Sequence, residues 1–287
     1  MMRTTLTTLL LLTFFASPAL AGAWLQPEGK AYLRLSSGIL NTETRFDSEG
    51  EEVPFDASGG GFRNVSYEDL AVNFYAEVGI HPDWTVIGVG SWKNLQAEQP
   101  SAIFTTYGFG DLGLGVKRSL YRSTWTVASA SGMISVPTGY DPAEYPAIGS
   151  DVSEGSVSLE LGRAGHAWWS NVESFLKIRG GDFRSQVGGS LGGGFSVSSS
   201  WAFRGEFRGA VPVGSTDNTG SGALFDPTAV DPSNLDVAGT VSFNLPQGVA
   251  IEAGLRSTVW GENTLKGTRF SVALATSPSL RLWGGEE

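Results

Sequence analysis

The regular alternation of hydrophobic and polar residues constrains the fold of this chain more than any other feature of the sequence. Around residues 70–80, for example, Leu70, Val72 and Phe74 would share one face of an extended chain, and Asn73 would lie on the opposite face. Successive side chains of a β-strand point to opposite sides, so this pattern is typical of strands with one apolar and one polar face. The pattern recurs along most of the sequence between residues 31 and 274, and helical periodicity is nearly absent. The sequence therefore predicts an all-β fold of about twelve strands.

Three of these strands are predicted from weaker alternation, at residues 84–95, 125–136 and 184–195. The connections between the strands alternate in length. Five are short, at residues 81–83, 121–123, 164–166, 198–200 and 246–248. The intervening ones are long and polar at residues 41–66, 97–108, 138–153 and 214–233, with shorter exceptions at 180–182 and 261–266. Transmembrane barrels have tight periplasmic turns and long external loops, whereas a soluble sandwich has no reason to place its long loops at one end. We therefore predict an up-and-down antiparallel transmembrane β-barrel.

The N-terminus predicts export from the cytoplasm. Arg3 precedes an apolar run over residues 6–15, and Ala19 and Ala21 fit the small-residue cleavage rule of signal peptides. The run is too short for the alternative, an uncleaved membrane anchor, and no later stretch approaches 18 consecutive apolar residues. The expected layout is a signal peptide over residues 1–21, cleaved after Ala21, and an outer-membrane barrel over residues 22–287. The expected location is the outer membrane of a Gram-negative bacterium, in contact with lipid and lipopolysaccharide.

Aromatic residues cluster near the ends of the predicted strands, as interfacial girdles do. One group lies beside the short turns: Trp84, Trp125, Trp168, Trp169 and Trp201. A second group lies near the long connections: Trp92, Tyr107, Phe109 and Trp260. Core tryptophans of a soluble sandwich are the alternative, but they would not explain the inequality of the connections.

Composition and motifs argue against several other functions. The net charge of -10 and the pI near 4.8 disfavour nucleic acid as a partner. The segment 108–113 matches G-x-G-x-x-G but opens a strand rather than a helix, so no dinucleotide cofactor is predicted. His81 and His166 are the chain's two histidines and fall in predicted turns, and there is no cysteine, so we predict neither a catalytic residue nor a metal site. The acidic long loops could bind divalent cations that bridge lipopolysaccharide, although a solvated run of charges is the simpler interpretation.

The charged residues of the strands are predicted to face the barrel interior. Arg204 and Arg208 share one strand face, and Phe203 and Phe207 share the other. An arginine facing lipid at the bilayer midplane costs roughly 2–4 kcal/mol, so the arginines must point inward. The same parity places a set of both signs in the lumen: Arg34, Glu77, Lys117, Glu160, Glu173, Lys177, Arg179, Arg204, Glu206, Arg208, Glu252, Arg256 and Arg269. These residues either line a pore or form salt bridges that brace the wall.

Four segments resemble a family of outer-membrane barrels named after the meta-pathway of phenol degradation. They are WLQPEGKAYLRL at residues 24–35, YAEVGI at 75–80 with TV after Trp84, GDLGLG at 110–115, and VPTGYD at 136–141. The resemblance implies passage of small, often hydrophobic solutes and an architecture related to long-chain fatty-acid and aromatic-hydrocarbon channels. Strand one begins about eight residues after the predicted cleavage site, which we expect to leave no room for the N-terminal hatch of fatty-acid channels.

Two functions remain open from the sequence. The first is an outer-membrane channel or transporter that passes small solutes, including hydrophobic or aromatic ones, through a narrow charged lumen. The second is a structural or adhesive barrel with a closed, salt-bridged lumen. Because no histidine is placed for lipid-cleaving chemistry, we do not predict an enzyme. The sequence makes no prediction about the oligomeric state.

Overall fold

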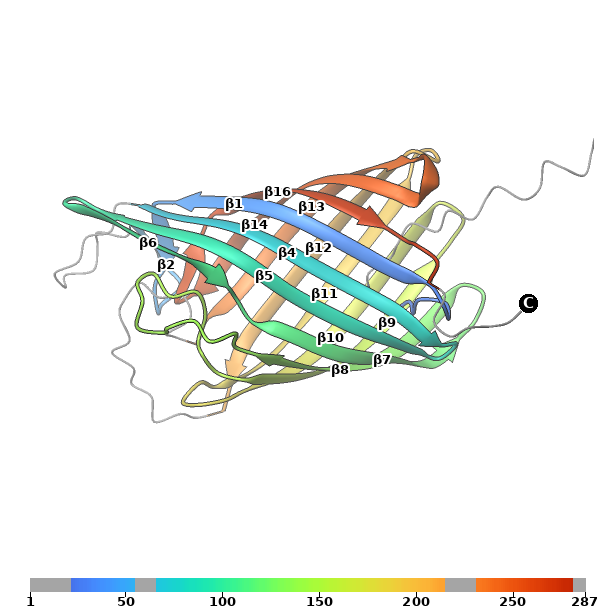
Figure 1. Cartoon of the computed structure of the whole chain (residues 1–287), viewed down its shortest axis with the longest axis horizontal. Helices are drawn as coiled ribbons and strands as arrows, with labels where there is room; N and C mark the ends of the chain where they lie inside the picture. Colours follow the sequence, from blue (N-terminus) through green and yellow to red (C-terminus); the bar gives the residue numbers. More distant parts are fainter. Residues whose placement is uncertain (1–21, 55–65, 215–230, 281–287) are drawn as a thin grey trace, which may run out of the picture.

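The computed structural model describes residues 22–54, 66–214 and 231–280. Thirteen strands form one antiparallel sheet that closes into a twelve-position barrel, because β6 and β7 occupy one position in succession (Figure 1). The strands of the barrel are β1 (Ala31–Thr42), β4 (Ser66–His81), β5 (Trp84–Gln99), β6 (Ala102–Phe109), β7 (Leu112–Arg122), β8 (Thr126–Val136), β9 (Glu154–Ala164), β10 (Trp168–Arg179), β11 (Ser185–Ser196), β12 (Trp201–Val213), β13 (Ser233–Leu245), β14 (Val249–Glu262) and β16 (Thr268–Thr276). A separate small sheet contains β2 (Thr44–Phe46), β3 (Glu52–Pro54) and β15 (Thr264–Lys266).

The barrel closes where the two ends of the chain meet. β1 pairs with both β16 and β4, and β4 pairs with β5, so the sheet returns on itself. Closure gives every barrel strand except β6 a partner on both sides, which a strand needs if it is to lie in hydrocarbon. The predicted all-β fold and the up-and-down barrel of about twelve strands are confirmed, including the three strands predicted from weak alternation.

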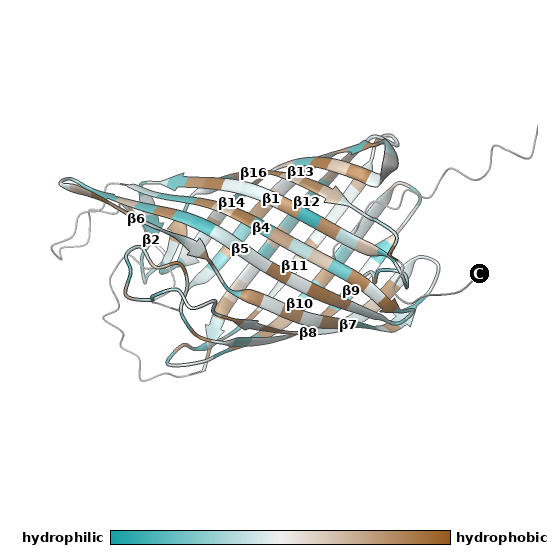
Figure 2. Cartoon of the chain, in the orientation of Figure 1, coloured by the Kyte–Doolittle hydropathy of each residue, from teal (hydrophilic) through white to brown (hydrophobic). Residues whose placement is uncertain are grey.

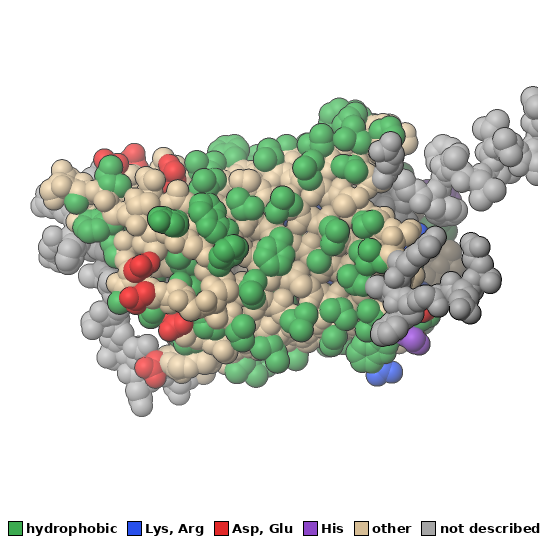
Figure 3. All heavy atoms as spheres, viewed as in Figure 1, with side chains coloured by type: hydrophobic (Ala, Val, Ile, Leu, Met, Phe, Trp, Pro, Cys, Tyr) green, Lys and Arg blue, Asp and Glu red, His purple; other side chains and the backbone are tan. Residues whose placement is uncertain are grey.

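The outer surface of the barrel is apolar, as the alternation in the sequence requires. Leu114, Leu159 and Phe270 have exposed fractions of 67%, 59% and 61% although they are large and hydrophobic. Hydrophobic residues recur along the strands in Figure 2, and Figure 3 shows apolar side chains across the middle of the barrel. Such a surface would drive aggregation in water but is the expected outer face of a barrel embedded in lipid.

The two ends of the barrel differ in their connections. One end, which we call the turn end, has short turns between β4 and β5, β7 and β8, β9 and β10, β11 and β12, and β13 and β14. The opposite end, which we call the loop end, carries the long connections and the acidic side chains visible at the left of Figure 3. Apart from a 3-10 turn, η2 (Pro246–Gly248), the part of the chain that the structure describes contains no helix. No helix in those residues is long and apolar enough to cross a membrane.

Two sequence predictions about the ends need correction. Residues 97–108 are not a polar loop, because β5 and β6 form a hairpin across them that projects at the loop end (Figure 1). Tyr107 and Ile103 on β6 have exposed fractions of 72% and 66%, so this hairpin continues the alternation of a strand. Trp169 does not belong to the outer girdle, because it points inward and packs edge-to-face on Trp24, with 6.5 Å between ring centroids.

Candidate functional site: the barrel interior

The barrel encloses a cavity of about 930 Å³, which we take as the candidate site. Of the thirteen charged residues predicted to face inward, ten line it: Arg34, Lys117, Glu160, Glu173, Lys177, Arg204, Glu206, Arg208, Arg256 and Arg269. The other three, Glu77, Arg179 and Glu252, form ion pairs with charged side chains of the interior. The strand registers explain this placement, since each of these residues has the parity opposite to the exposed apolar residues of its strand.

The N-terminal segment 22–30 enters the barrel at the turn end and crosses its interior. Gln26 is held at two points, because its backbone N–H donates to Thr85 Oγ1 (3.0 Å) and its side-chain amide donates to Glu77 Oε2 (2.8 Å). Gly22 lines the cavity, and its carbonyl accepts a hydrogen bond from Lys117 Nζ. The sequence led us to expect no room for an N-terminal hatch, yet residues of this segment do lie inside the barrel. Nine residues are enough to reach there, because an extended chain spans roughly 3.3 Å per residue. That the segment obstructs the lumen stays a prediction.

A glycine makes room for this segment. Residues 29 and 30 exchange backbone hydrogen bonds with Gly79, the residue of β4 that faces the interior next to the turn. A Cβ atom on Gly79 would collide with the backbone of Pro27 and Gln26. Glycine is thus required here because the two backbones approach closely. The bulge of β4 lies at the same place, between Gly79 and His81.

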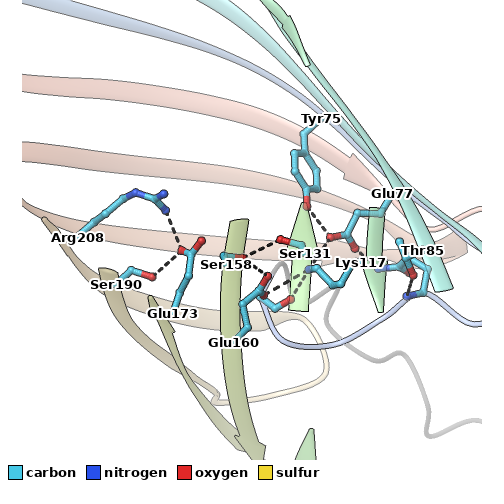
Figure 4. Close-up of polar contacts among 12 residues, drawn as sticks. Tyr75, Glu77, Thr85, Lys117, Ser131, Ser158, Glu160, Glu173, Ser190 and Arg208 are labelled. Atoms are coloured by element: carbon cyan, nitrogen blue, oxygen red, sulfur yellow. Dashed lines mark hydrogen bonds and ion pairs between the residues drawn. The ribbon is translucent and has the colours of Figure 1, made fainter. Parts of the chain in front are cut away.

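The segment is anchored on a buried charged cluster (Figure 4). Lys117 on β7 lies 3.3 Å from Glu77 Oε1 on β4 and 3.4 Å from Glu160 Oε2 on β9. The side chains of these residues are 3%, 0% and 7% exposed, and Tyr75 donates its hydroxyl hydrogen to Glu77. One ammonium group therefore forms ion pairs with two carboxylates that are shielded from solvent, where an unpaired charge would be destabilising. We call these three charged residues the Lys117 cluster.

The arginines on the other side of the barrel are less buried. Arg34 on β1 and Arg204 on β12 flank Glu252 on β14, and Arg208 on β12 pairs with Glu173 on β10 at 3.2 Å. The remaining pairs there are Arg256 with Glu206 (3.5 Å) and Asp236 (3.8 Å), and Arg269 with Asp69 (2.6 Å). In each pair the arginine side chain is more exposed than its acid, for example 40% against 21% for Arg208 and Glu173. The guanidinium groups are consequently more accessible from the cavity than the carboxylates they pair with.

Four ion pairs, centred on Glu154 and Asp231, lie nearer the loop end. Glu154 on β9 binds both Lys177 (3.3 Å) and Arg179 (2.8 Å) of β10. Arg179 also reaches Asp231, at 3.3 Å, where the chain enters β13. Asp231 further accepts hydrogen bonds from the backbone and side chain of Arg184. These contacts join β9, β10 and the residue Asp231 just before β13, so they brace the wall of the barrel.

The connection between β8 and β9 folds back onto the barrel rather than extending into solvent. Ile148 is 2% exposed and packs in a cluster with Tyr67, Leu95 and Ala97, and Lys93 Nζ donates to its carbonyl (2.7 Å). These contacts hold the connection against the loop-end mouth of the barrel. Sequence reasoning missed this cluster, although the apolar residues within an otherwise polar connection were a usable signal.

Tyr140 lies in the same connection between β8 and β9, and its hydroxyl forms two hydrogen bonds that hold the connection in place. Its hydroxyl donates to Asp111 Oδ1 (2.7 Å), and it accepts from the backbone N–H of Asp151. Burial, reinforced by the hydrogen bond to Asp111, raises the pKa of Tyr140 well above its ordinary value. Asp111 lies between β6 and β7 in the G-x-G-x-x-G match, so this segment is a break between two strands and opens no helix.

Neither histidine lies in the cavity. His81 is exposed at the end of β4, and His166 is exposed in the turn after β9, where its ring lies 5.1 Å from that of Trp125. Within the described ranges, no group of three or more acidic residues or histidines is arranged to hold a metal ion. The chemistry of the interior is thus that of ion pairs, hydrogen-bond donors and a few aromatic rings.

No family model and no curated protein matches this sequence. Among solved structures, the chain is similar to the COG4313 outer membrane channel from Pseudomonas putida F1, with a TM-score of 0.72 and 13% identity over 89% of this chain and 98% of the channel. Weaker likenesses include the CymD monoaromatic hydrocarbon channel (TM-score 0.46, 10% identity, 89% of each chain) and the Pseudomonas putida toluene transporter TodX (0.43, 11%, 89% and 90%). At these identities the first likeness establishes the fold, which is that of an outer-membrane barrel.

Proposed function

We propose that the protein is an outer-membrane channel that passes small solutes, including apolar and aromatic ones, through a narrow charged lumen. The observation that carries this proposal is the cavity of about 930 Å³ inside a barrel whose fold matches an outer membrane channel along nearly that channel's whole length. A barrel built only to present loops would need no cavity lined by partly exposed guanidinium groups. The resemblance to the phenol meta-pathway family supports the same class of solute.

We also propose how the protein reaches the outer membrane. Export by the signal peptide 1–21, which lies outside the described residues, would be followed by insertion with the turn end in the periplasm. Cleavage after Ala21 would leave the amino group of Gly22 inside the barrel, beside Lys117 and Asn171. Contact of the acidic loop end with lipopolysaccharide belongs to the same proposal. We favour a channel over an enzyme because the matched fold is that of a channel and both histidines lie at the turn end.

A closed structural barrel is the second candidate, and one observation favours it. The N-terminal segment and the ion pairs occupy much of the interior at the turn end, so the lumen could serve only to brace the wall. The two candidates differ in whether solute crosses the barrel.

Single-channel recording in planar bilayers tests the choice, with the double variant Arg204→Ser and Arg208→Ser as the probe. If the lumen conducts, the wild type should show defined conductance steps, and the variant should change their size or their ion selectivity. The outer-surface variant Arg163→Gln provides the control, because Arg163 is exposed on the outside of β9. Negligible conductance in wild type and variant alike would favour the closed barrel.

A further inference from the structure

We propose that Arg34 and Arg204 form a binding site for the carboxylate of a small organic anion, with the apolar part of that anion lying in the same cavity. The inference rests on the proposed function, because it names the class of solute that the lumen would take. The site itself is inferred from an unbalanced positive charge in the cavity wall, and this charge is present whether or not the barrel conducts.

Two guanidinium groups share a single carboxylate oxygen at this site. Arg34 Nε donates to Glu252 Oε2 at 2.9 Å, and Arg204 Nη2 lies 3.8 Å from the same oxygen, which is too far for a hydrogen bond. The side chains of Arg34 and Arg204 are 26% and 27% exposed, whereas that of Glu252 is 9% exposed. One buried carboxylate thus lies behind two partly exposed cations, and the site carries one positive charge that is not compensated locally.

The other arginines of the lumen are compensated. Arg208 and Arg269 each have an acidic partner of their own, and Arg256 lies between two acids. The excess of positive charge is therefore specific to the Arg34–Glu252–Arg204 arrangement. A compensating excess of carboxylate lies beside Arg256, which has two acidic neighbours, Glu206 and Asp236. This separation of charge along the cavity wall would orient an anion with its charged group toward Arg34 and Arg204.

Hydrogen-bond donors at the site suit a carboxylate. Apart from Glu252, the contacts of these two guanidinium groups are long ones to hydroxyls, from Arg34 Nη1 to Ser36 Oγ (3.3 Å) and from Arg204 Nη2 to Thr240 Oγ1 (3.4 Å). A guanidinium offers more N–H donors than these contacts use. Paired N–H donors match the two oxygens of a carboxylate, and such charged hydrogen bonds are stronger than neutral ones.

The rest of the cavity supplies apolar surface for the body of the anion. Val89 of β5, Met133 of β8 and Phe175 of β10 line it, and each is only partly buried. Tyr75 lies against Tyr32 with 6.1 Å between the ring centroids, and both also line the cavity. A ligand with one anionic group and a compact apolar or aromatic body would satisfy both sides of the cavity.

Equilibrium binding of benzoate and its neutral analogue benzamide to the detergent-solubilised protein tests the site. The two probes have similar shape and differ in charge. We expect the wild type to bind benzoate about tenfold more tightly than benzamide, the effect of roughly one added charged hydrogen-bond pair, and we expect the preference to fall as salt is raised. Arg204→Gln, which leaves the balanced pair of Arg34 and Glu252, should abolish the preference.

A second variant predicts the opposite sign. Glu252→Gln removes the carboxylate that competes with the ligand, so benzoate should bind several-fold more tightly than to the wild type. Arg163→Gln, on the outer surface, should bind both probes as the wild type does. Heat-modifiable migration on gels would show that each variant is folded.

The proposal is overturned if the wild type binds neither probe or both equally, or if its preference for benzoate survives in Arg204→Gln. The measurement involves no passage across a membrane. A barrel that binds benzoate but does not conduct would therefore refute the proposed channel and leave the site intact, whereas a conducting barrel without the preference would refute only the site.

Discussion

Replacement of Lys117 by methionine should destabilise the barrel more than any other single loss of a lumen cation. The substitution keeps an unbranched side chain only one atom shorter but leaves Glu77 and Glu160, 0% and 7% exposed, without their shared ammonium. Removing one partner of a buried ion pair costs about 3–5 kcal/mol, because the remaining charge is desolvated and unpaired. The carbonyl of Gly22 would also lose its donor, so the N-terminal segment should loosen at the same time.

Reversible urea unfolding in lipid vesicles, followed by tryptophan fluorescence, measures this cost. Lys177→Met is the matched control, because Lys177 is 36% exposed and Arg179 remains bound to its partner Glu154. We expect this control to lose less than about 1 kcal/mol, as exposed ion pairs do. A triple variant with Lys117→Met, Glu77→Gln and Glu160→Gln should recover most of the loss. Equal free energies of unfolding for Lys117→Met and Lys177→Met would refute the argument that the cluster is desolvated and coupled.

Three further predictions concern the two ends of the barrel. Trp24→Gly should weaken the hold of the N-terminal segment by removing its edge-to-face contact inside the barrel, so conductance in planar bilayers should rise; an unchanged or smaller conductance would mean that the segment does not obstruct the lumen. The raised pKa of Tyr140 means that folding favours its neutral form, so the contribution of its hydrogen bond with Asp111 to the stability of this connection should be complete at neutral pH and fall only as the pH rises above about 10, the ordinary pKa of tyrosine. Protease cleavage of this connection should therefore increase at alkaline pH, and Tyr140→Phe should show the increase already at neutral pH. Epitope tags at Glu51 should label on intact cells and tags at Ser199 should not, and labelling of Ser199 alone would invert the orientation.

The barrel could be predicted from the sequence because the lipid bilayer imposes a rule on each strand residue separately. Leu112, Leu114 and Val116 must face lipid, so the residues between them must face inward, and no knowledge of distant contacts is needed. The same parity placed Arg204 and Arg208 inside. Connections were harder to assign, since residues 97–108 look polar while forming the β5–β6 hairpin beyond the barrel wall.

The N-terminal segment could not be predicted, because its position depends on contacts between residues far apart in the chain. Gln26 is held by Thr85 and Glu77, and neither interaction has a local signature in the sequence. The inward orientation of Trp169 has the same origin, since its partner Trp24 lies on that segment. Alternation assigns a residue to one face of a strand, but it does not reveal which other segment occupies the interior.

The two interpretations of the charged lumen, bracing and lining, apply to different residues of the same barrel. Lys117, Glu77 and Glu160 are almost fully buried, so they stabilise the wall and the N-terminal segment and have little surface to offer a solute. The arginines on the opposite side have side chains that are 26–41% exposed, and they can meet a solute without first losing their acidic partners. The bracing cluster also contributes to the electrostatic field of the cavity, because Lys117 and Glu160 line the same cavity as these arginines. A variant of the buried cluster should therefore alter ion selectivity as well as stability, whereas a variant such as Arg204→Gln should alter selectivity with little effect on unfolding.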